Sequence, residues 1–397
     1  MALTSVLLIA PLLAVAAPLL ARGLGRWIAV PVVVFELLLG IVAGPSVLGW
    51  AQPSDLVALL ADLGLAMLFF MAGTEIEVDA LRGRTGRRAA GGWVLSLAIG
   101  VAIGWLIAPG EGAIIIGVAL CSTALGTLIP ILRDAGELRT PFGRSVSAVG
   151  AVGEFGPLIA ISVLLGTRDP GVASLVLAGF FVVAALAVWA SIAIPRGALH
   201  RAVTASLHTS GQFAIRVLLL LLLALLTLSI VLDLDMLLGA FTAGVVWRLL
   251  LRDAPTPTRE AVESKVEALA FGFLIPLFFV YTGITFDLSS LMAQPVLLLF
   301  VPVVLVALLV ARGLPASLAA PAGSSWRGKA SVGLMGATGL PIIVAVTAIG
   351  VEADVLAPAA ASVLVAGGML SVLVLPLIAM AIRPRVGQGA SSSVVSR

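Results

Sequence analysis

The chain has 397 residues, of which 61% are hydrophobic and 11% are charged, and its mean hydropathy is +1.20. This composition excludes a soluble globular domain and predicts an all-α integral membrane protein. The 23 basic and 20 acidic residues leave a formal net charge of +3, and the single cysteine, Cys121, excludes a disulfide framework or a cysteine metal site.

Apolar runs long enough to cross a bilayer recur along the chain. A hydrocarbon core of roughly 30 Å needs about 20 residues per helix. Runs of this kind start near residues 4, 27, 56, 88, 112, 143, 171, 212, 236, 266, 292, 328 and 356. We therefore predict about thirteen transmembrane helices within residues 1–382, of which the first is retained rather than cleaved. Residues 383–397 are expected to form a short cytoplasmic tail without a regulatory domain.

The loops between these runs separate into two sets by charge. Alternate loops carry most of the arginines, among them Arg22, Arg84, Arg133, Arg252 and Arg327. The other loops carry acidic residues, among them Asp55, Glu111, Asp169, Asp233 and Glu352, with Arg168 as their only cation. Because cytoplasmic loops collect Arg and Lys, we expect a cell (inner) membrane protein with its N-terminus outside and its C-terminus in the cytoplasm.

Two segments of the first half recur in the same order in the second half. Leu38–Gly40 is similar to Leu237–Gly239, and Leu68–Phe70 is similar to Leu277–Phe279. Leu68–Phe70 runs toward the arginine-rich side and Leu277–Phe279 runs away from it, which indicates an inverted repeat. We predict repeats of approximately 27–166 and 210–350, a construction typical of secondary transporters.

Each half also contains one interrupted span. The run CSTALGT from Cys121 to Thr127 is followed by Pro130, and the run GATGL from Gly336 to Leu340 is followed by Pro341. Irregular backbone inside a membrane persists only where protein or water satisfies it, and half-helix ends offer carbonyls and dipoles to an ion. We therefore expect two crossed discontinuous helices. The alternative is that the small residues only allow close helix packing.

The breaks and the sixth span supply the candidate binding residues. We expect Ser122, Thr123 and Thr338 to offer oxygen atoms to a small cation beside Glu154. Glu154 has no basic residue in its own span, and ionisable residues inside a membrane are costly and usually functional. We interpret Glu154 as the ligand for which a transported monovalent metal cation and a proton compete. Alternatively, a protonated Glu154 only hydrogen-bonds across a helix interface.

Three further charged residues lie within or at the end of predicted spans. Arg312 either compensates the charge of Glu154 or extends from a helix end to the lipid headgroups. Glu36 lies deep in the second span, where a structural or vestibule role is favoured. Glu75 lies at the inner end of the third span. Glu36 and Glu75 are possible accessory sites.

Five ordered segments match the motifs of a known family. They are Glu36–Gly49, Leu68–Glu77, Ser122–Leu125, Leu238–Gly244 and Ile275–Gly283. In these segments the chain resembles the sodium/proton exchanger and Kef-type branch of the monovalent cation:proton antiporters, and the resemblance extends over residues 1–382. It implies exchange of Na⁺ or K⁺ for protons, by a homodimer whose core domain moves like an elevator against a dimerisation domain. We favour Na⁺ as the cation.

The chain departs from this family at two positions. Relatives usually carry Asp-Asp, Asn-Asp or Gln-Asp where this sequence has Gly153-Glu154, which leaves one carboxylate. Arg312 stands where electrogenic relatives often carry lysine, and an arginine does not release its proton. We therefore expect electroneutral exchange of one cation for one proton.

Two other kinds of function stay open. A passive cation channel or an exporter of an organic ion could use the same fold. Ser122 and Glu154 could in principle act as nucleophile and base of an intramembrane enzyme, but no histidine, lysine or metal cluster in the spans supports this. We expect a transporter that is not an enzyme, with no cofactor and no nucleic-acid partner.

Overall fold

The computed structural model describes residues 2–24, 31–75, 83–165, 169–193, 212–252 and 254–383. The regular elements within these residues are all helical. Apart from Arg383, the predicted tail lies outside the described residues, and so do Glu77 and Arg168. The all-α expectation is thus confirmed for the described part of the chain.

The helices follow one another with short connections. The first half forms α1 (Ala2–Leu24), α2 (Val32–Ala43), α3 (Asp55–Glu75), α4 (Gly83–Ile107), α5 (Glu111–Leu120), α6 (Leu125–Asp134), α7 (Pro141–Leu164) and α8 (Pro170–Ala193). The second half begins with α10 (Phe213–Val231), α11 (Met236–Leu251), α12 (Thr256–Leu269), the π-helix η1 (Ala270–Leu274), α13 (Ile275–Ile284) and α14 (Leu288–Ala293). It continues with the 3-10 helix η2 (Pro295–Leu299), α15 (Phe300–Leu308), the π-helix η3 (Leu309–Gly313), α16 (Leu314–Ala316), the 3-10 helix η4 (Ser317–Ala319), α17 (Trp326–Gly336), α18 (Pro341–Glu352) and α19 (Pro358–Ile382).

Local sequence explains where several helices begin. The side chains of Thr140 and Ser325 precede α7 and α17 and accept hydrogen bonds from the backbone N–H groups three residues later. Asp235 caps α11 in the same way, through the N–H of Leu237. Such caps satisfy backbone donors that have no partner inside the helix.

The lengths of the helices fit a membrane protein with many spans. Eight described helices are long and apolar enough to cross a membrane, and the bent pair α17–α18 brings this number to at most nine. Four shorter apolar helices, at Leu7–Gly23, Val32–Ala43, Pro170–Leu186 and Met236–Leu251, lie at other predicted spans. The total of thirteen spans stays a prediction.

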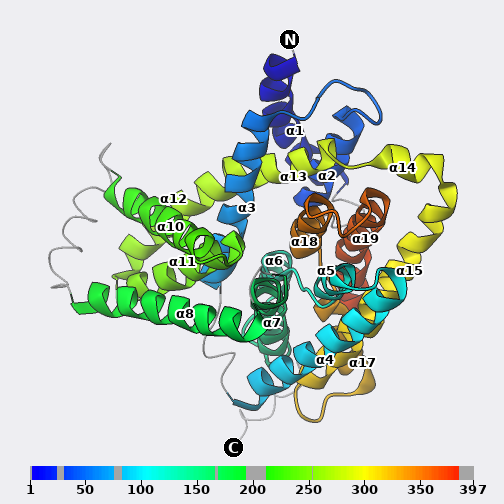
Figure 1. Cartoon of the computed structure of the whole chain (residues 1–397). Helices are drawn as coiled ribbons and strands as arrows, with labels where there is room; N and C mark the ends of the chain where they lie inside the picture. Colours follow the sequence, from blue (N-terminus) through cyan, green and yellow to red (C-terminus); the bar gives the residue numbers. More distant parts are fainter. Residues whose placement is uncertain are drawn as a thin grey trace, which may run out of the picture.

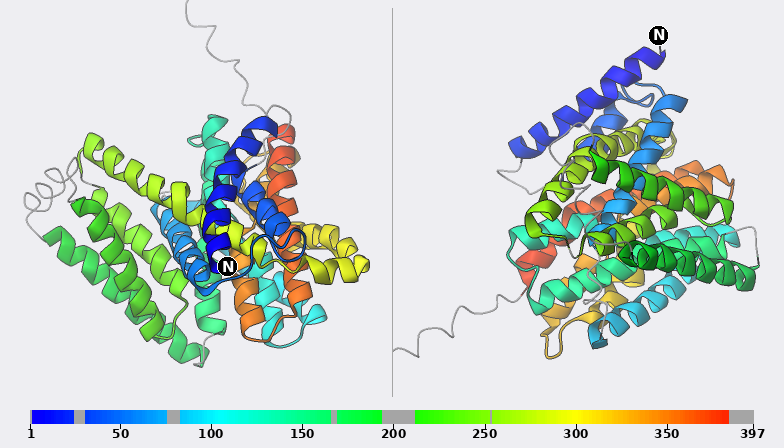
Figure 2. Two further views of the ribbon diagram at one scale, coloured as in Figure 1. Left: turned by 90° about the horizontal axis from the view of Figure 1, so that it is seen from above. Right: turned by 90° about the vertical axis from the view of Figure 1, so that its left-hand side faces the viewer.

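The helices gather in two bundles (Figure 1). One bundle, which we call the glycine-crossed bundle, contains α1, α2, α3, α10, α11, α12 and α13. The other, the broken-helix bundle, contains α4, α5, α6, α7, α15, α17, α18 and α19. Helix α8 contacts both α7 and α11. In Figure 2 the green helices α8, α10 and α11 lie on one side of the molecule, away from the orange helices α17 and α18 on the other.

Two very close helix crossings hold the glycine-crossed bundle together. Helix α2 crosses α13, and α3 crosses α11. At each crossing, a Cβ added to a glycine would lie 2.0–2.3 Å from a backbone oxygen of the facing helix; the four glycines are Gly40, Gly283, Gly73 and Gly244. Only glycine allows this approach. Each crossing joins one helix of the first half to one of the second, as an inverted repeat would require, and the repeat boundaries 27–166 and 210–350 stay a prediction.

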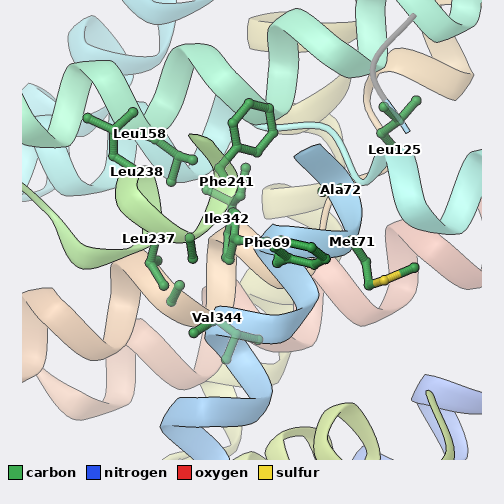
Figure 3. Close-up of a cluster of buried hydrophobic side chains, with 14 of the residues drawn as sticks. Phe69, Met71, Ala72, Leu125, Leu158, Leu237, Leu238, Phe241, Ile342 and Val344 are labelled. Atoms are coloured by element: carbon green, nitrogen blue, oxygen red, sulfur yellow. The ribbon is translucent and has the colours of Figure 1, made fainter. Parts of the chain in front are cut away.

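Buried apolar side chains fill the boundary between the bundles. Figure 3 shows Phe69 of α3, Leu158 of α7, Phe241 of α11 and Ile342 of α18 within one cluster. The rings of Phe155 and Phe241 are stacked with centroids 5.2 Å apart. Because Phe155 follows Glu154 in α7, this apolar boundary lies next to the candidate site.

Candidate functional site

Two helix breaks meet inside the broken-helix bundle, one between α5 and α6 and the other between α17 and α18. Helices α17 and α18 are bent by 42° at their break. The backbone N–H of Ala124 in the first break donates to the carbonyl of Thr338 in the second at 2.7 Å. This hydrogen bond therefore gives a partner to one backbone group of each break. Backbone groups of irregular structure inside a membrane need such partners.

A proline and the non-helical residue before it interrupt the helix at the second break. Pro341 opens α18 and has no N–H to continue a helix across the break. Leu340, just before it, has φ −145° and ψ −55° and is not helical. The N–H of Gly339 donates to Ser371 Oγ of α19 at 3.1 Å. A side chain of a neighbouring helix thus replaces a hydrogen bond that the break removes.

Three of the hydroxyl groups predicted at the breaks, those of Ser122, Thr123 and Thr338, donate to backbone carbonyls. Ser122 Oγ donates to Ala119 O at 2.8 Å, and Thr338 Oγ1 donates to Leu334 O at 3.1 Å. Thr123 Oγ1 donates to Gly336 O, the last carbonyl of α17, at 2.6 Å. These hydroxyls hold the breaks in place, and none of them lines a cavity found in the described residues.

Arg312 is fully buried and belongs to the same cluster. It lies in the π-helix η3, and its Nε donates to Thr123 Oγ1 at 2.8 Å. Its Nη2 donates to Val149 O of α7 at 2.7 Å, whereas Nη1 has no partner among the described residues. With an exposed fraction of 0%, the side chain does not extend to lipid headgroups. Arg312 therefore ties the first break to α7.

The charge of Arg312 faces helix ends rather than a carboxylate. The described residues contain no ion pair between Arg312 and Glu154 within 4.0 Å. Thr123, to which Arg312 donates, follows the C-terminus of α5 and binds the C-terminal carbonyl of α17. The C-terminus of a helix carries partial negative charge, which favours a cation there. Direct compensation of Glu154 by Arg312 stays a prediction.

Glu154 lies at the opposite kind of helix end. The backbone N–H groups of Leu125 and Gly126, at the start of α6, lie close to its carboxylate. The side chain is 4% exposed, and its Oε2 has no partner in the described part of the chain. A helix N-terminus stabilises negative charge. The start of α6 thus favours a negative charge on Glu154, whose Oε2 has no partner among the described residues.

Glu154 lines a small cavity of about 50 Å³. Glu75 and Thr127 also line it, together with Gly126. The other lining residues are apolar: Val33, Leu68, Met71, Ala72, Phe271, Ile275, Phe279 and Pro341. Two carboxylates and one hydroxyl in an apolar cavity form a set of hard oxygen ligands, which suits a small cation.

A larger cavity of about 780 Å³ lies at the arginine-rich ends of α3, α6, α11 and α12. Met71 and Glu75 line both cavities, so they form the wall between them. Arg133 and Arg248 line the large cavity, and Arg248 donates to the carbonyl of Thr74, next to Glu75, at 2.6 Å. The large cavity leads toward Glu154 by way of Glu75.

The structure divides the residues predicted from sequence into separate groups. Glu154 and Glu75 line one cavity, whereas Ser122, Thr123, Thr338 and Arg312 form the framework of the breaks. Glu36 is buried in α2 and lines neither cavity. Sequence reasoning included Thr127 only as part of the first break. Its position two residues after Leu125 was the available signal, since that places it on the first turn of α6.

Comparisons with known proteins agree with the fold. Residues 11–382 match the family described as "Sodium/hydrogen exchanger, transmembrane". The chain is 30% identical over 291 residues to the Na(+)/H(+)-K(+) antiporter GerN of Bacillus cereus, covering 68% of this chain and 69% of GerN. It is 24% identical over 295 residues to a Na(+)/H(+) antiporter of Enterococcus hirae, covering 71% and 73% of the two chains. Its fold is similar to that of the sodium proton antiporter MjNhaP1 from Methanocaldococcus jannaschii, with a TM-score of 0.67, 18% identity and coverage of 96% and 99%.

Proposed function

The chain belongs to the sodium/hydrogen exchanger family, and we propose that it exchanges a monovalent cation for protons across a cell membrane. The resemblance noted from the sequence is thereby confirmed. Members of this family are multi-pass transporters and not enzymes. The observation that carries the proposal is Glu154, whose Oε2 has no partner among the described residues and which lines a cavity together with a second acidic residue, Glu75.

Competition at Glu154 is the proposed basis of coupling. An alkali cation and a proton both bind carboxylate oxygen, and the free oxygen of Glu154 has room for one of them at a time. A cation that enters the small cavity therefore displaces the proton, and a proton that returns displaces the cation. The N–H groups of Leu125 and Gly126 stay close to the carboxylate during this exchange.

Alternating access requires the site to open to each side in turn. The breaks and Glu154 belong to the broken-helix bundle, while glycine crossings lock the other bundle. We propose that the broken-helix bundle slides against the glycine-crossed bundle in an elevator-like motion. The large cavity lies among arginines, which supports the proposal that it faces the cytoplasm and that this structure represents an inward-open state.

The finer parts of the proposal come from the sequence and the relatives. GerN is described as a Na(+)/H(+)-K(+) antiporter, and we favour Na⁺ over K⁺ as the cation of this chain. We propose a homodimer in the inner membrane, with electroneutral exchange. Arg312 keeps its charge throughout and holds the first break through Thr123.

Proteoliposomes that contain a pH-sensitive dye test this function. Addition of Na⁺ to the outside of vesicles with the wild-type protein should alkalinise the lumen, because Na⁺ enters the vesicles and protons leave them in exchange. Glu154→Gln should abolish the signal while leaving the melting temperature intact. The matched control is Glu111→Gln, an exposed carboxyl group at the start of α5 that should behave as wild type.

The same assay separates the alternatives. Cation-dependent proton flux that persists in Glu154→Gln would refute the assignment of the site. Passive Na⁺ uptake without proton movement in the wild-type protein would show a channel. Li⁺, K⁺ and an organic cation, added one at a time, identify the counter-substrate.

A further inference from the structure

Three side chains bring oxygen atoms to the small cavity beside Glu154. They are Glu154 and Glu75, each with an Oε2 that has no partner among the described residues, and Thr127. Among the described residues, no lysine, arginine or histidine lines this cavity. Its volume of about 50 Å³ is comparable to the share of one or two waters in the liquid, roughly 30 Å³ each. A cation inside it must therefore exchange most of its water for protein oxygens.

Thr127 differs from the other hydroxyl residues of the breaks. Ser122, Thr123 and Thr338 each donate to a backbone carbonyl. The side chain of Thr127 makes no hydrogen bond within the described part of the chain.

The break itself accounts for this difference. A threonine inside a helix usually bonds to the carbonyl three or four residues earlier. For Thr127, the residue four earlier is Thr123, which lies in the break and outside α6. The carbonyl three residues earlier, on Ala124, already accepts from the backbone N–H groups of Thr127 and Leu128 at 3.2 Å each. The helix start therefore leaves the hydroxyl of Thr127 free on the wall of the cavity.

We propose that the hydroxyl of Thr127 is a ligand of the transported cation and determines which alkali cation the site prefers. This inference rests on the proposed exchange function and assigns Thr127 to the same site. A neutral hydroxyl oxygen binds a cation but does not titrate near neutral pH. Removing it weakens cation binding and leaves proton binding at Glu154 in place. No other neutral side-chain oxygen lines this cavity in the described residues.

The test compares three variants in proteoliposomes and in detergent. Thr127→Val keeps the shape of the side chain and removes its oxygen, whereas Thr127→Ser keeps the oxygen. Thr347→Val is the matched control, since the hydroxyl of Thr347 is bonded to Ile343 O within α18 and lines neither cavity. The measurements are the KM for Na⁺, Li⁺ and K⁺, the pH profile at saturating cation, and calorimetric binding of Na⁺ to the purified protein.

We expect Thr127→Val to raise the KM and the Kd for Na⁺ roughly tenfold, the effect of losing one polar contact. The ratio of the Li⁺, Na⁺ and K⁺ constants should change, and the pH profile at saturating cation should stay the same. Thr127→Ser should restore wild-type constants. An unchanged KM, Kd and cation preference in Thr127→Val would overturn the proposal, and so would a pH profile that shifts with it.

The calorimetric experiment separates this inference from the proposed function. If the wild-type protein binds Na⁺ but moves no protons, the proposed exchange function is wrong. The effect of Thr127→Val on the Kd for Na⁺ still shows whether Thr127 is a ligand of the cation. Should Thr127→Val not be purified as a folded protein, Thr127→Cys takes its place, because sulfur is a poor ligand for a hard alkali cation. Equal Kd values for Thr127→Cys and the wild type would then overturn the proposal.

Discussion

The guanidinium of Arg312 occupies the space that a side chain at position 153 would need. A Cβ on Gly153 would lie 2.5 Å from Arg312 Nη2 and 2.4 Å from Thr123 Oγ1. The glycine is therefore part of the arrangement that holds the first break. The resemblance to antiporters with Asp, Asn or Gln at this position implies that they place a polar group where this chain places an arginine.

Substituting Gly153 by alanine should destabilise the protein. The added methyl group forces Thr123 or Arg312 out of its hydrogen bonds, and overpacking of this kind costs about 1–3 kcal/mol. We expect a lower melting temperature in detergent and slower exchange. Gly179→Ala is the matched control in a helix, because nothing lies within 4 Å of its added Cβ. Equal melting temperatures for Gly153→Ala and Gly179→Ala would contradict the packing argument.

Replacing Arg312 by lysine should also destabilise the protein, although the charge is kept. The planar guanidinium donates to Thr123 Oγ1 and Val149 O from two different nitrogens, and one ammonium group at the end of a flexible chain does not reproduce that fork. A lost hydrogen bond from a charged group costs about 1.5–3 kcal/mol. The comparison is Arg144→Lys, at an exposed arginine near the start of α7. Thermal unfolding of both variants measures the difference, and a stable Arg312→Lys would show that charge alone suffices.

The all-helical fold and the helix breaks could be predicted because their causes are local. Long apolar runs form spans. Pro341 and the glycines before it interrupt one of these spans, because they act on the local backbone and do not depend on distant contacts. The contact between Ala124 and Thr338 was expected as a crossing, but its hydrogen bond depends on the packing of both halves. We predicted the first break within the run Cys121–Thr127, whereas α6 already begins at Leu125.

The different roles of the hydroxyl residues and the position of Arg312 could not be predicted from residue types. Ser122, Thr123 and Thr127 carry the same functional group within one short run. Which of them is free depends on where α6 begins and on which carbonyls lie within reach. For Arg312, the sequence left both a countercharge role and a position at the headgroups open. Its complete burial follows from the packing of η3 against α17 and α4.

The pH dependence of stability should contain a contribution from Asp235, at the start of α11. Burial raises the pKa of Asp235 from its ordinary 3.8 to about 6, against the opposing hydrogen bonds from the N–H groups of Leu237 and Leu238. The folded state therefore holds this proton more tightly than the unfolded state. The resulting stability is present below pH 4 and is lost as the pH rises through about 6.

Asp235→Asn isolates this contribution, because an amide oxygen still accepts the N–H of Leu237 while the charge is absent. The melting temperature of the wild type relative to Asp235→Asn should fall between pH 4 and pH 7 and then level off. Asp55→Asn, at the exposed start of α3, serves as the control. A difference that does not vary with pH, or that grows as the pH rises, would contradict the burial of this carboxyl group.

Exchange should move no net charge, because we propose that Glu154 alone alternates between one cation and one proton. Gly153 supplies no second carboxylate, and Arg312 stays protonated throughout the cycle. Glu75 is the one other acidic side chain on the small cavity, at the wall that leads to the large cavity. In the proposed cycle it passes protons and cations on to Glu154 and ends each cycle in the state in which it began.

Current recording on a solid-supported membrane measures the net charge moved during exchange. A Na⁺ concentration jump should produce proton movement detected by dye but no sustained current. Glu75→Gln should slow the exchange without changing its ratio of one cation to one proton.

A reproducible Na⁺-dependent current in the wild type would require a second proton carrier. If Glu75→Gln then removed that current while dye-detected exchange persisted, Glu75 would be that carrier and would load a second proton beside Glu154. If the current survived in Glu75→Gln, Glu36 would be the carrier to test next, although it lines neither cavity in this structure.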